Sequence, residues 1–255
     1  MSKDWTKIRA KVKDFIESEI YPKETELAKG TPEAREMLGS LMQLAKDEKI
    51  WALGHPEDIG GGGMPFMEYV YVNEVIGRSS FAMVALGTHS LQDSIMLREF
   101  ASPHWRDQYL EPLVQGEIFP SFGMTEPDVA SSDPTQLQTT AILDNGTWKI
   151  NGTKWFTTGA ARAAYTTVMC RTELDAPSHG AFSMIIVPTD NPGYKIVRET
   201  PVLGINGGHY EVKYDNVEVP EENLLGPRGQ GFIIAQKRLG PCLLYTSPSP
   251  RDISR

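Results

Sequence analysis

The chain has few cysteines, no concentration of basic residues and no long apolar run. Only two of its 255 residues are cysteines, Cys170 and Cys242, which gives neither a disulfide framework nor a metal-ligand spacing. Its 25 Lys and Arg against 33 Asp and Glu give a net charge of −8, without a basic stripe, so nucleic acid is not an expected partner. The longest apolar stretch, 81–86, is far shorter than the ~20 residues of a membrane span, so none is expected.

The motifs of several enzyme classes are also missing. The four glycines at 60–63 follow no strand and precede no Gly-Lys-Ser/Thr, which favours a flexible loop over a phosphate-binding loop. No Gly-x-Gly-x-x-Gly follows a strand, the five histidines have no ligand spacing, and no Gly-x-Ser-x-Gly elbow is present. The first residues are charged where a secretory signal would be apolar. We therefore expect a cytoplasmic protein, or a mitochondrial or peroxisomal one if the source is eukaryotic.

What is present is the composition of an ordinary globular protein, 40% hydrophobic and 23% charged, with a length that suits two domains. Apolar residues recur at helical spacing from Trp5 to Ile20, and Pro22 is expected to end that helix. Further helices are predicted at 32–45, 65–76, 80–95 and 103–115, with a glycine-rich loop at 54–63.

From residue 119 to about residue 219 the pattern is alternating and β-branched. Asp144-Asn145-Gly146 between two apolar runs predicts a hairpin, and Asn151-Gly152 predicts a second tight turn before a strand at 154–158. Further strands are predicted at 165–171, 182–188, 194–199 and 210–214. Closely spaced strands without helices between them favour an antiparallel sandwich or barrel over a doubly wound sheet.

The predicted fold class is therefore α+β. An N-terminal all-α helical domain at 1–118 precedes an antiparallel β-barrel or sandwich domain at 119–229, and a C-terminal helical domain starts at 230–241. Residues 242–255 include Pro248 and Pro250, which the interior of a continuing helix would not tolerate. That string also resembles translated adaptor sequence, so we expect a non-native tail there.

Two segments of the β-region have the chemistry of a binding site. Residues 122–133 pass from a strand into small and hydroxyl residues, which would offer N–H and O–H donors beside an apolar edge. Residues 151–160 place two aromatic residues next to Thr157 and Thr158 on one strand. Such surfaces suit a flat heterocycle with carbonyl acceptors on its rim. A common Ser/Asp/Pro turn and a strand that merely packs are the alternative interpretations.

The same segments resemble those of the acyl-CoA dehydrogenases. Met-Thr-Glu-Pro at 124–127, Ala-Ser-Ser-Asp at 130–133 and Lys-Trp-Phe-Thr-Thr-Gly at 154–159 are similar to the family's two flavin-binding segments. Six further stretches keep the family order between residues 1 and 241: 56–61, 74–80, 109–118, 216–220, 223–226 and 229–232. The segments 124–133 and 236–241 are most similar to the branch that some animals carry fused behind a phosphotransferase-like domain.

The resemblance implies FAD as the cofactor. The residues that it assigns to FAD are Phe122, Met124, Thr125, Ser131, Phe156, Thr157 and Thr158. Phe156 would stand against the isoalloxazine ring, where the family usually has tryptophan, and the Thr158 hydroxyl would lie near flavin N5. Ser131 or Ser132 would contact the acyl-CoA phosphate region. Both serines are candidates because 128–133 is one residue longer than the family's usual Gly-Ala-Gly-Ser-Asp.

The resemblance also implies an activity, the α,β-dehydrogenation of an acyl-CoA thioester with hydride passing to FAD. An electron-transferring flavoprotein would take the electrons, and the full-length protein would be a dimer or tetramer. No residue of this chain matches the family's catalytic glutamate, which belongs to the C-terminal helical domain, so we expect an inactive fragment with weak or no flavin retention. An acyl-CoA oxidase or flavin monooxygenase on the same fold, and a non-catalytic flavin- or CoA-binding module, are the alternatives.

Overall fold

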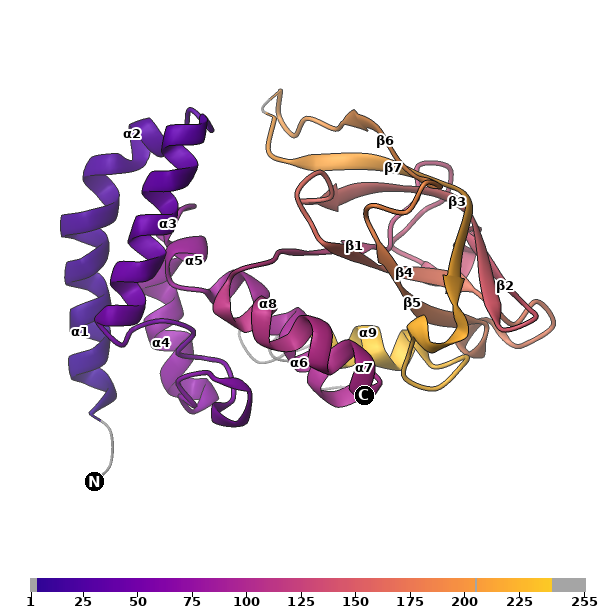
Figure 1. Cartoon of the computed structure of the whole chain (residues 1–255), viewed down its shortest axis with the longest axis horizontal. Helices are drawn as coiled ribbons and strands as arrows, with labels where there is room; N and C mark the ends of the chain where they lie inside the picture. The colour runs from indigo at the N-terminus through magenta and orange to yellow at the C-terminus, as the bar shows by residue number, and fades with distance from the viewer. Residues whose placement is uncertain (1–3, 205, 240–255) are drawn as a thin grey trace. The chain divides into compact units, whose positions relative to one another are not determined.

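The computed structural model describes residues 4–204 and 206–239, which form two compact units (Figure 1). Within the described residues, the first unit comprises 4–95 and 114–116, and the second comprises 96–113, 117–204 and 206–239. The predicted non-native tail at 242–255 and the end of the predicted helical segment at 240–241 lie outside the described residues. Within the described ranges, no helix is long and apolar enough to cross a bilayer.

The first unit is helical. Its elements are α1 (Trp5–Phe15), a π-helical turn (Ile16–Ile20), two 3-10 turns (Tyr21–Lys23 and Glu57–Ile59), α2 (Glu24–Leu27), α3 (Pro32–Asp47), α4 (Phe66–Ile76), α5 (Ala82–Ala85), a third 3-10 turn (Thr88–Ser90) and the start of α6 (Leu91–Phe100). α3 begins as predicted, because the Thr31 hydroxyl accepts the Ala34 N–H and Pro32 occupies the first turn. α1 packs against α4, where Arg9 pairs with Glu74 at 2.6 Å.

Two helix predictions in this unit are wrong. Pro22 does not end the first helical run, because it occupies the start of a 3-10 turn, where its missing N–H costs nothing, and the chain continues into α2. The predicted helix at 80–95 is broken at Gly87, which adopts φ +69°. A Cβ at Gly87 would lie 2.6 Å from Cε2 of the Trp51 ring, so this position requires glycine.

The second unit is built on one eight-stranded sheet. Its strands are β1 (Pro120–Gly123), β2 (Thr140–Asp144), β3 (Thr147–Thr158), β4 (Tyr165–Arg171), β5 (Phe182–Pro188), β6 (Tyr194–Glu199), β7 (His209–Pro220) and β8 (Leu224–Leu225). The order is β6-β7-β3-β2-β4-β5-β8, and β1 pairs with β4 off this path. The pairing is antiparallel, except that β1 and one residue pair of β2 run parallel to β4. The helical segments described from residue 103 on are α7 (Pro103–Trp105), a π-helical turn (Arg106–Leu110), α8 (Glu111–Gln115), three 3-10 turns (Pro134–Gln136, Ser178–Gly180 and Glu221–Asn223) and α9 (Gly231–Leu239).

The predicted α+β class is confirmed. Across the described residues the sheet does not close, so the barrel, one of the two predicted forms, is not formed. The core of the unit contains Trp148, Ile150, Val168, Ile185 and Val212. On the helical side, Trp105 stacks on Tyr109 with 4.8 Å between ring centroids, and Tyr109 meets Tyr165 of β4 edge-on at 5.1 Å.

β3 differs from its prediction. The hairpin at Asp144-Asn145-Gly146 forms as predicted, with positive φ at Asn145 and Gly146. Asn151-Gly152 is not a turn, because β3 runs unbroken from Thr147 to Thr158. Gly152 has φ +152°, and a Cβ there would lie 2.7 Å from the Cα of Thr139, so glycine permits the close approach of that residue.

Two β-bulges shape the pairing of β3 with β7. Asn216 of β7, at φ +51°, lies between the pairs Ile150–Val217 and Gly152–Tyr214. Phe156 of β3, at φ +50°, lies between the pairs Lys154–Val212 and Thr157–Tyr210. Each bulge inserts an extra residue and changes which side chains face the core.

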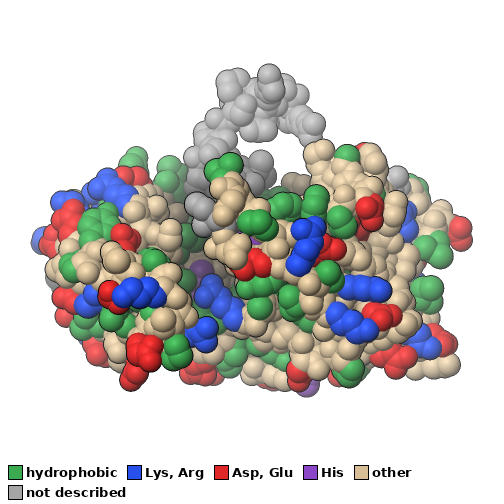
Figure 2. Space-filling view, turned by 90° about the horizontal axis from the view of Figure 1, so that it is seen from above, with side chains coloured by type: hydrophobic (Ala, Val, Ile, Leu, Met, Phe, Trp, Pro, Cys, Tyr) green, Lys and Arg blue, Asp and Glu red, His purple; other side chains and the backbone are tan. Residues whose placement is uncertain are grey.

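The surface is charged in a mixed fashion. On the face drawn in Figure 2, Lys and Arg side chains are interspersed with Asp and Glu, and apolar side chains lie between them. Exposed pairs such as Lys11–Glu48 and Lys195–Asp215, each at 2.6 Å, are examples in the two units. Exposed ion pairs of this kind contribute little to stability, about 0–1 kcal/mol each.

Candidate functional site

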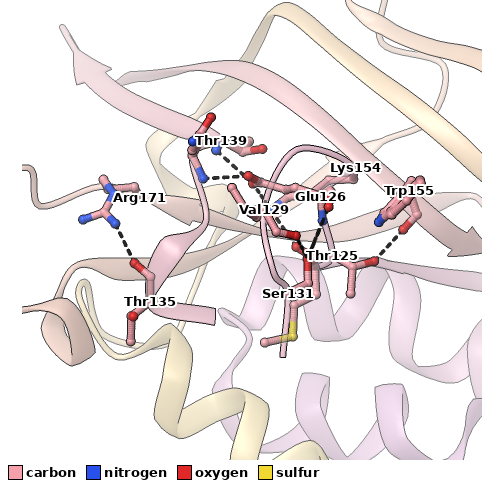
Figure 3. A network of polar contacts seen from close by, with 11 residues as sticks. Thr125, Glu126, Val129, Ser131, Thr135, Thr139, Lys154, Trp155 and Arg171 are labelled. Carbon is pink, nitrogen blue, oxygen red and sulfur yellow. Dashed lines mark hydrogen bonds and ion pairs between the residues drawn. The ribbon is translucent and has the colours of Figure 1, made fainter. Parts of the chain in front are cut away.

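The two segments singled out in the sequence are hydrogen-bonded to each other (Figure 3). The Trp155 N–H donates to the Thr125 carbonyl at 3.0 Å, and the Thr125 hydroxyl donates to the Trp155 carbonyl at 2.7 Å. These two hydrogen bonds connect Thr125, in the segment after β1, to Trp155, in the bulge of β3. The Ser121 hydroxyl of β1 adds a second connection by donating to the Thr158 carbonyl at 2.9 Å.

A buried ion pair lies behind this connection. The side chain of Lys154 is 0% exposed, and its Nζ donates to the Met124 carbonyl at 2.9 Å and to Oε1 of Glu126 at 2.8 Å. The Glu126 carboxylate also accepts the backbone N–H groups of Gln138 at 2.6 Å and Thr139 at 2.9 Å. Both charges therefore have the hydrogen-bond partners that burial demands.

Burial and pairing act in opposite directions on these two groups. Burial raises the pKa of Glu126, but the Lys154 ammonium and the donated hydrogen bonds outweigh it, so that this pKa lies below its ordinary value. Burial lowers the pKa of Lys154, and the Glu126 carboxylate opposes that shift. Burial raises the pKa of the adjacent Cys170 thiol to about 12, which makes the thiol inert.

The loop between Glu126 and Thr139 is fixed along its length. The Ser131 hydroxyl accepts the Glu126 N–H at 2.9 Å and lies 3.3 Å from the Glu126 carbonyl, so it closes the turn at 126–131. Arg171 of β4 donates to the Thr135 carbonyl at 2.9 Å. The neighbouring Ser132 is exposed. The structure thus gives the two candidate serines different positions, one in the turn and one at the surface.

The aromatic and hydroxyl residues at the end of β3 face two ways. The Phe156 side chain is 42% exposed, and the exposed Thr158 places its Oγ1 2.8 Å from Nδ1 of His209 on β7. The Phe156 and His209 rings lie 6.3 Å apart. Thr157 is buried, because the bulge returns it to the face on which Lys154 lies. The three predicted residues do not share one face.

The remaining predicted residues lie in β1 and directly after it. Phe122 is half-buried, and the Arg238 guanidinium of α9 lies 4.3 Å from the centroid of its ring. Met124 contributes its carbonyl to the Lys154 ammonium. The structure therefore brings Met124, Thr125 and Ser131 into one hydrogen-bonded network with β3, while Phe156 and Thr158 stand at the surface of the same strand.

Sequence reasoning missed Glu126, Lys154 and His209. A signal for Lys154 exists, because the alternation that sets Trp148 and Ile150 inward continues to Lys154, and a buried lysine needs a carboxylate or carbonyl partner. Glu126 is the charged residue of the segment that this lysine would reach. His209 has no comparable signal, since its approach to Thr158 depends on the bulge at Phe156.

Two family models cover most of the chain. The N-terminal domain model of the acyl-CoA dehydrogenases matches residues 2–117, and the middle domain model matches residues 121–217. The chain belongs to the acyl-CoA dehydrogenase family. The family predicted from the sequence is therefore confirmed.

Curated relatives of the chain include a bacterial protein and animal proteins. "Probable acyl-CoA dehydrogenase FadE2" of Mycobacterium tuberculosis is 40% identical over 247 residues, which cover 91% of this chain and 60% of the relative. Acyl-CoA dehydrogenase family member 10 of Mus musculus is 35% identical and is covered to 24%, and family member 11 of Homo sapiens is 35% identical and is covered to 32%. The chain thus spans 60% or less of the length of these relatives.

Solved structures share the fold. A structure from Mycobacterium abscessus named for this family has a TM-score of 0.86 at 33% identity, with 94% of this chain and 64% of that chain covered. The acyl-CoA dehydrogenase of Geobacillus kaustophilus has a TM-score of 0.77 at 26% identity, with 94% and 63% covered. A glutaryl-CoA dehydrogenase of Mycobacterium smegmatis, solved in complex with FADH2, has a TM-score of 0.76 at 23% identity, with 94% and 60% covered.

Proposed function

We propose that this chain is the FAD-binding part of a flavin-dependent acyl-CoA dehydrogenase. The observation that supports the proposal is the reciprocal hydrogen-bonded pair between Thr125 and Trp155, which sets the two predicted flavin segments side by side. The glutaryl-CoA dehydrogenase of similar fold was solved with FADH2, which favours FAD among heterocyclic cofactors. A bound flavin would supply a hydride acceptor for the C–H bond next to an acidified thioester α-carbon.

The side chains at the surface of β3 fit a flat heterocycle. Phe156 exposes an aromatic face on which a ring system can stack. Thr158 has one hydroxyl donor and two acceptor lone pairs, so its hydroxyl can hydrogen-bond to His209 and to a ring nitrogen of the cofactor at the same time. We assign Phe156 and Thr158 to direct contact, and Phe122, Met124 and Thr125 to the opposite segment. Thr157 would act from the buried side of the strand.

For the acyl-CoA substrate we propose a division between the two serines. Ser131 holds the turn at 126–131 through the Glu126 N–H, so its hydroxyl is already engaged. Ser132 is exposed on the same loop and would be the residue that contacts the phosphate region of the substrate. Ser131 would contribute to substrate and cofactor binding by shaping that loop.

The catalytic base and the assembly are proposals from the family. The proton next to the thioester would be removed by a glutamate of a C-terminal helical domain following the start at 230–241, because no residue of this chain matches it. Dehydrogenation would then pass electrons to an electron-transferring flavoprotein, in a dimer or tetramer located in the cytoplasm, mitochondrion or peroxisome. An acyl-CoA oxidase, a flavin monooxygenase and a non-catalytic flavin- or CoA-binding module are the alternatives.

FAD binding tests the proposal directly. The purified 255-residue chain should retain little or no flavin and show no dehydrogenase activity, while added FAD should bind weakly, measured by quenching of flavin fluorescence. Thr158→Val should weaken this binding about tenfold, which corresponds to one hydrogen bond of ~1.4 kcal/mol. Thr147→Val, at the far end of β3, is the matched control and should leave the affinity unchanged. Equal affinities in the two variants would contradict the assignment of Thr158.

A second experiment separates the alternatives. In the protein completed by its C-terminal domain, an acyl-CoA added without oxygen should bleach the flavin absorbance. On admission of air, a dehydrogenase recovers its absorbance slowly and an oxidase recovers it at once. A non-catalytic module would bind FAD or acyl-CoA without bleaching at all.

A further inference from the structure

We propose that Lys154 is a positioning residue that fixes both the flavin-facing segment and the loop of Ser131 and Ser132 against β3. This inference rests on the proposed function, because the ligand whose binding it controls would be FAD. Lys154 was not among the predicted site residues, and its side chain is fully buried. It therefore acts through the groups that it holds.

Lys154 contacts the residue before Thr125 and the residue after it. Its Nζ holds the carbonyl of Met124, the residue before Thr125, at 2.9 Å, and the carboxylate of Glu126, the residue after it, at 2.8 Å. Thr125 itself is bonded to Trp155, the neighbour of Lys154 on β3. Three consecutive residues of the first segment are thus bonded to two consecutive residues of the second, and Figure 3 labels Thr125, Glu126, Lys154 and Trp155 among them.

The same ammonium controls the loop through Glu126. The carboxylate that it pairs with accepts the N–H groups of Gln138 and Thr139, which close the far end of the loop. At the near end, the Glu126 N–H donates to the Ser131 hydroxyl. A change at Lys154 therefore reaches the backbone beside Thr125 and the turn that carries both serines.

The polarity of this pair is fixed by its partners. Lys154 must donate to a carbonyl, and Glu126 must accept two backbone N–H groups, so an exchange of the two residues could not reproduce the network. Neutral residues at both positions can preserve packing and are often tolerated in place of a buried ion pair. They would still leave the Met124 carbonyl without its ammonium donor. Stability and segment position can therefore be separated by mutation.

Two variants make the separation. Lys154→Met leaves a buried carboxylate unpaired, so it should lower the free energy of unfolding and weaken FAD binding at least tenfold. The double variant Glu126→Gln/Lys154→Met removes that charge and should recover most of the lost stability, measured by urea unfolding. Its FAD affinity should stay at least tenfold below that of the wild type, because the Met124 carbonyl still lacks the hydrogen bond that Lys154 donates.

Asn223→Ala is the matched control for stability. Asn223 is buried and donates to the Ile186 carbonyl at 2.7 Å, and among the described residues its side chain hydrogen-bonds to neither segment. The variant should unfold more easily than the wild type and bind FAD with the wild-type affinity. Recovery of FAD affinity together with stability in the double variant would overturn the positioning role, as would a tenfold loss of affinity in Asn223→Ala.

A readout without flavin distinguishes this proposal from the proposed function. The Trp155 amide, which bonds the Thr125 carbonyl, should exchange with deuterium at least tenfold faster in the double variant than in Asn223→Ala. If the wild-type chain binds no added FAD, the proposed function fails for this chain, and the exchange at Trp155 alone decides the positioning role. Equal exchange rates in the two variants would overturn it.

Discussion

Burial by itself would raise the pKa of the Glu126 carboxyl group. Its pKa lies below the ordinary value instead, since the Lys154 ammonium and the N–H groups of Gln138 and Thr139 favour the charged form by more than burial disfavours it. A carboxyl group with a lower pKa in the folded state binds its proton more weakly there than in the unfolded chain. Its stabilising contribution is complete above the unfolded pKa of about 4.5 and is lost as the pH falls through the folded value.

The prediction for Glu126 concerns how the free energy of unfolding changes at acidic pH. The free energy of unfolding of the wild type should fall more steeply below about pH 4.5 than that of Glu126→Gln, because only the wild type must protonate this carboxylate. Urea unfolding between pH 7 and pH 3 measures the two slopes. Glu74→Gln, which removes an exposed carboxylate that pairs with Arg78, is the control and should change the slope less. Parallel curves for the wild type and Glu126→Gln would contradict the ionised pair.

At the scale of elements, the conformation of β3 depends on Gly152, which lies against the backbone of Thr139. Gly152 has a conformation that residues with a side chain rarely adopt, and a Cβ would press on the backbone of Thr139. Gly152→Ala should therefore destabilise the protein by about 3 kcal/mol, combining backbone strain with overpacking. Thermal unfolding measures the change.

A second glycine of the same strand pair provides the control. Gly146, in the hairpin turn, also has a positive φ, but a Cβ there meets nothing within 4 Å. Gly146→Ala should cost only about 1 kcal/mol, the backbone part of the effect. If the two variants unfold at the same temperature, the close approach to Thr139 contributes nothing.

The sequence predicts elements whose signals are local. The Thr31-Pro32 start of α3 and the Asn145-Gly146 hairpin follow from capping and turn chemistry that nearby residues decide. The break at Gly87 and the bulge at Phe156 cannot be predicted in this way, because each depends on a contact with a residue far along the chain. Gly87 lies against the Trp51 ring, and Phe156 lies where β3 pairs with β7. The alternation of β3 therefore predicts the inward face up to Lys154 and fails directly after it.

The same limit applies to the candidate site. Its two segments were found from their residue types, but Phe156, Thr157 and Thr158 were expected to act together on one strand. The bulge at Phe156 reverses the alternation and sends Thr157 to the buried side. The approach of His209 to Thr158 follows from the same bulge, so no pattern in either strand alone could have revealed it.

At the scale of the whole molecule, the two units carry different titrating groups. The helical unit contains His55, which is 1% exposed and whose pKa burial lowers to about 4, with a smaller contribution from His89. A histidine with a lowered pKa is protonated more readily in the unfolded chain. Its contribution to the stability of the folded unit is therefore lost as the pH falls from about 6.5 towards about 4.

The prediction for His55 follows from the size of that shift. Between pH 7 and pH 4 the helical unit should lose about 3 kcal/mol of stability through this group, an order-of-magnitude value. Deuterium exchange of the Ala52 amide, which bonds the Leu86 carbonyl at 2.9 Å, reports on this unit. His55→Gln should flatten the pH dependence of this exchange, corrected for its intrinsic rate, and the exposed His104→Gln should not. An unchanged dependence in His55→Gln would show that another group is responsible.

The extent of the second unit determines which residue range should be expressed to obtain it as a separate protein. The unit begins at residue 96 and includes Trp105, which stacks on Tyr109, and Tyr109, which meets Tyr165 of the sheet edge-on. It also includes α9, whose Arg238 lies over the ring of Phe122. A protein limited to residues 121–217 would lack Trp105, Tyr109 and Arg238, and it would expose the apolar surface that they contact. A protein of residues 96–239 would keep all three, and it is the better choice for crystallisation with a flavin.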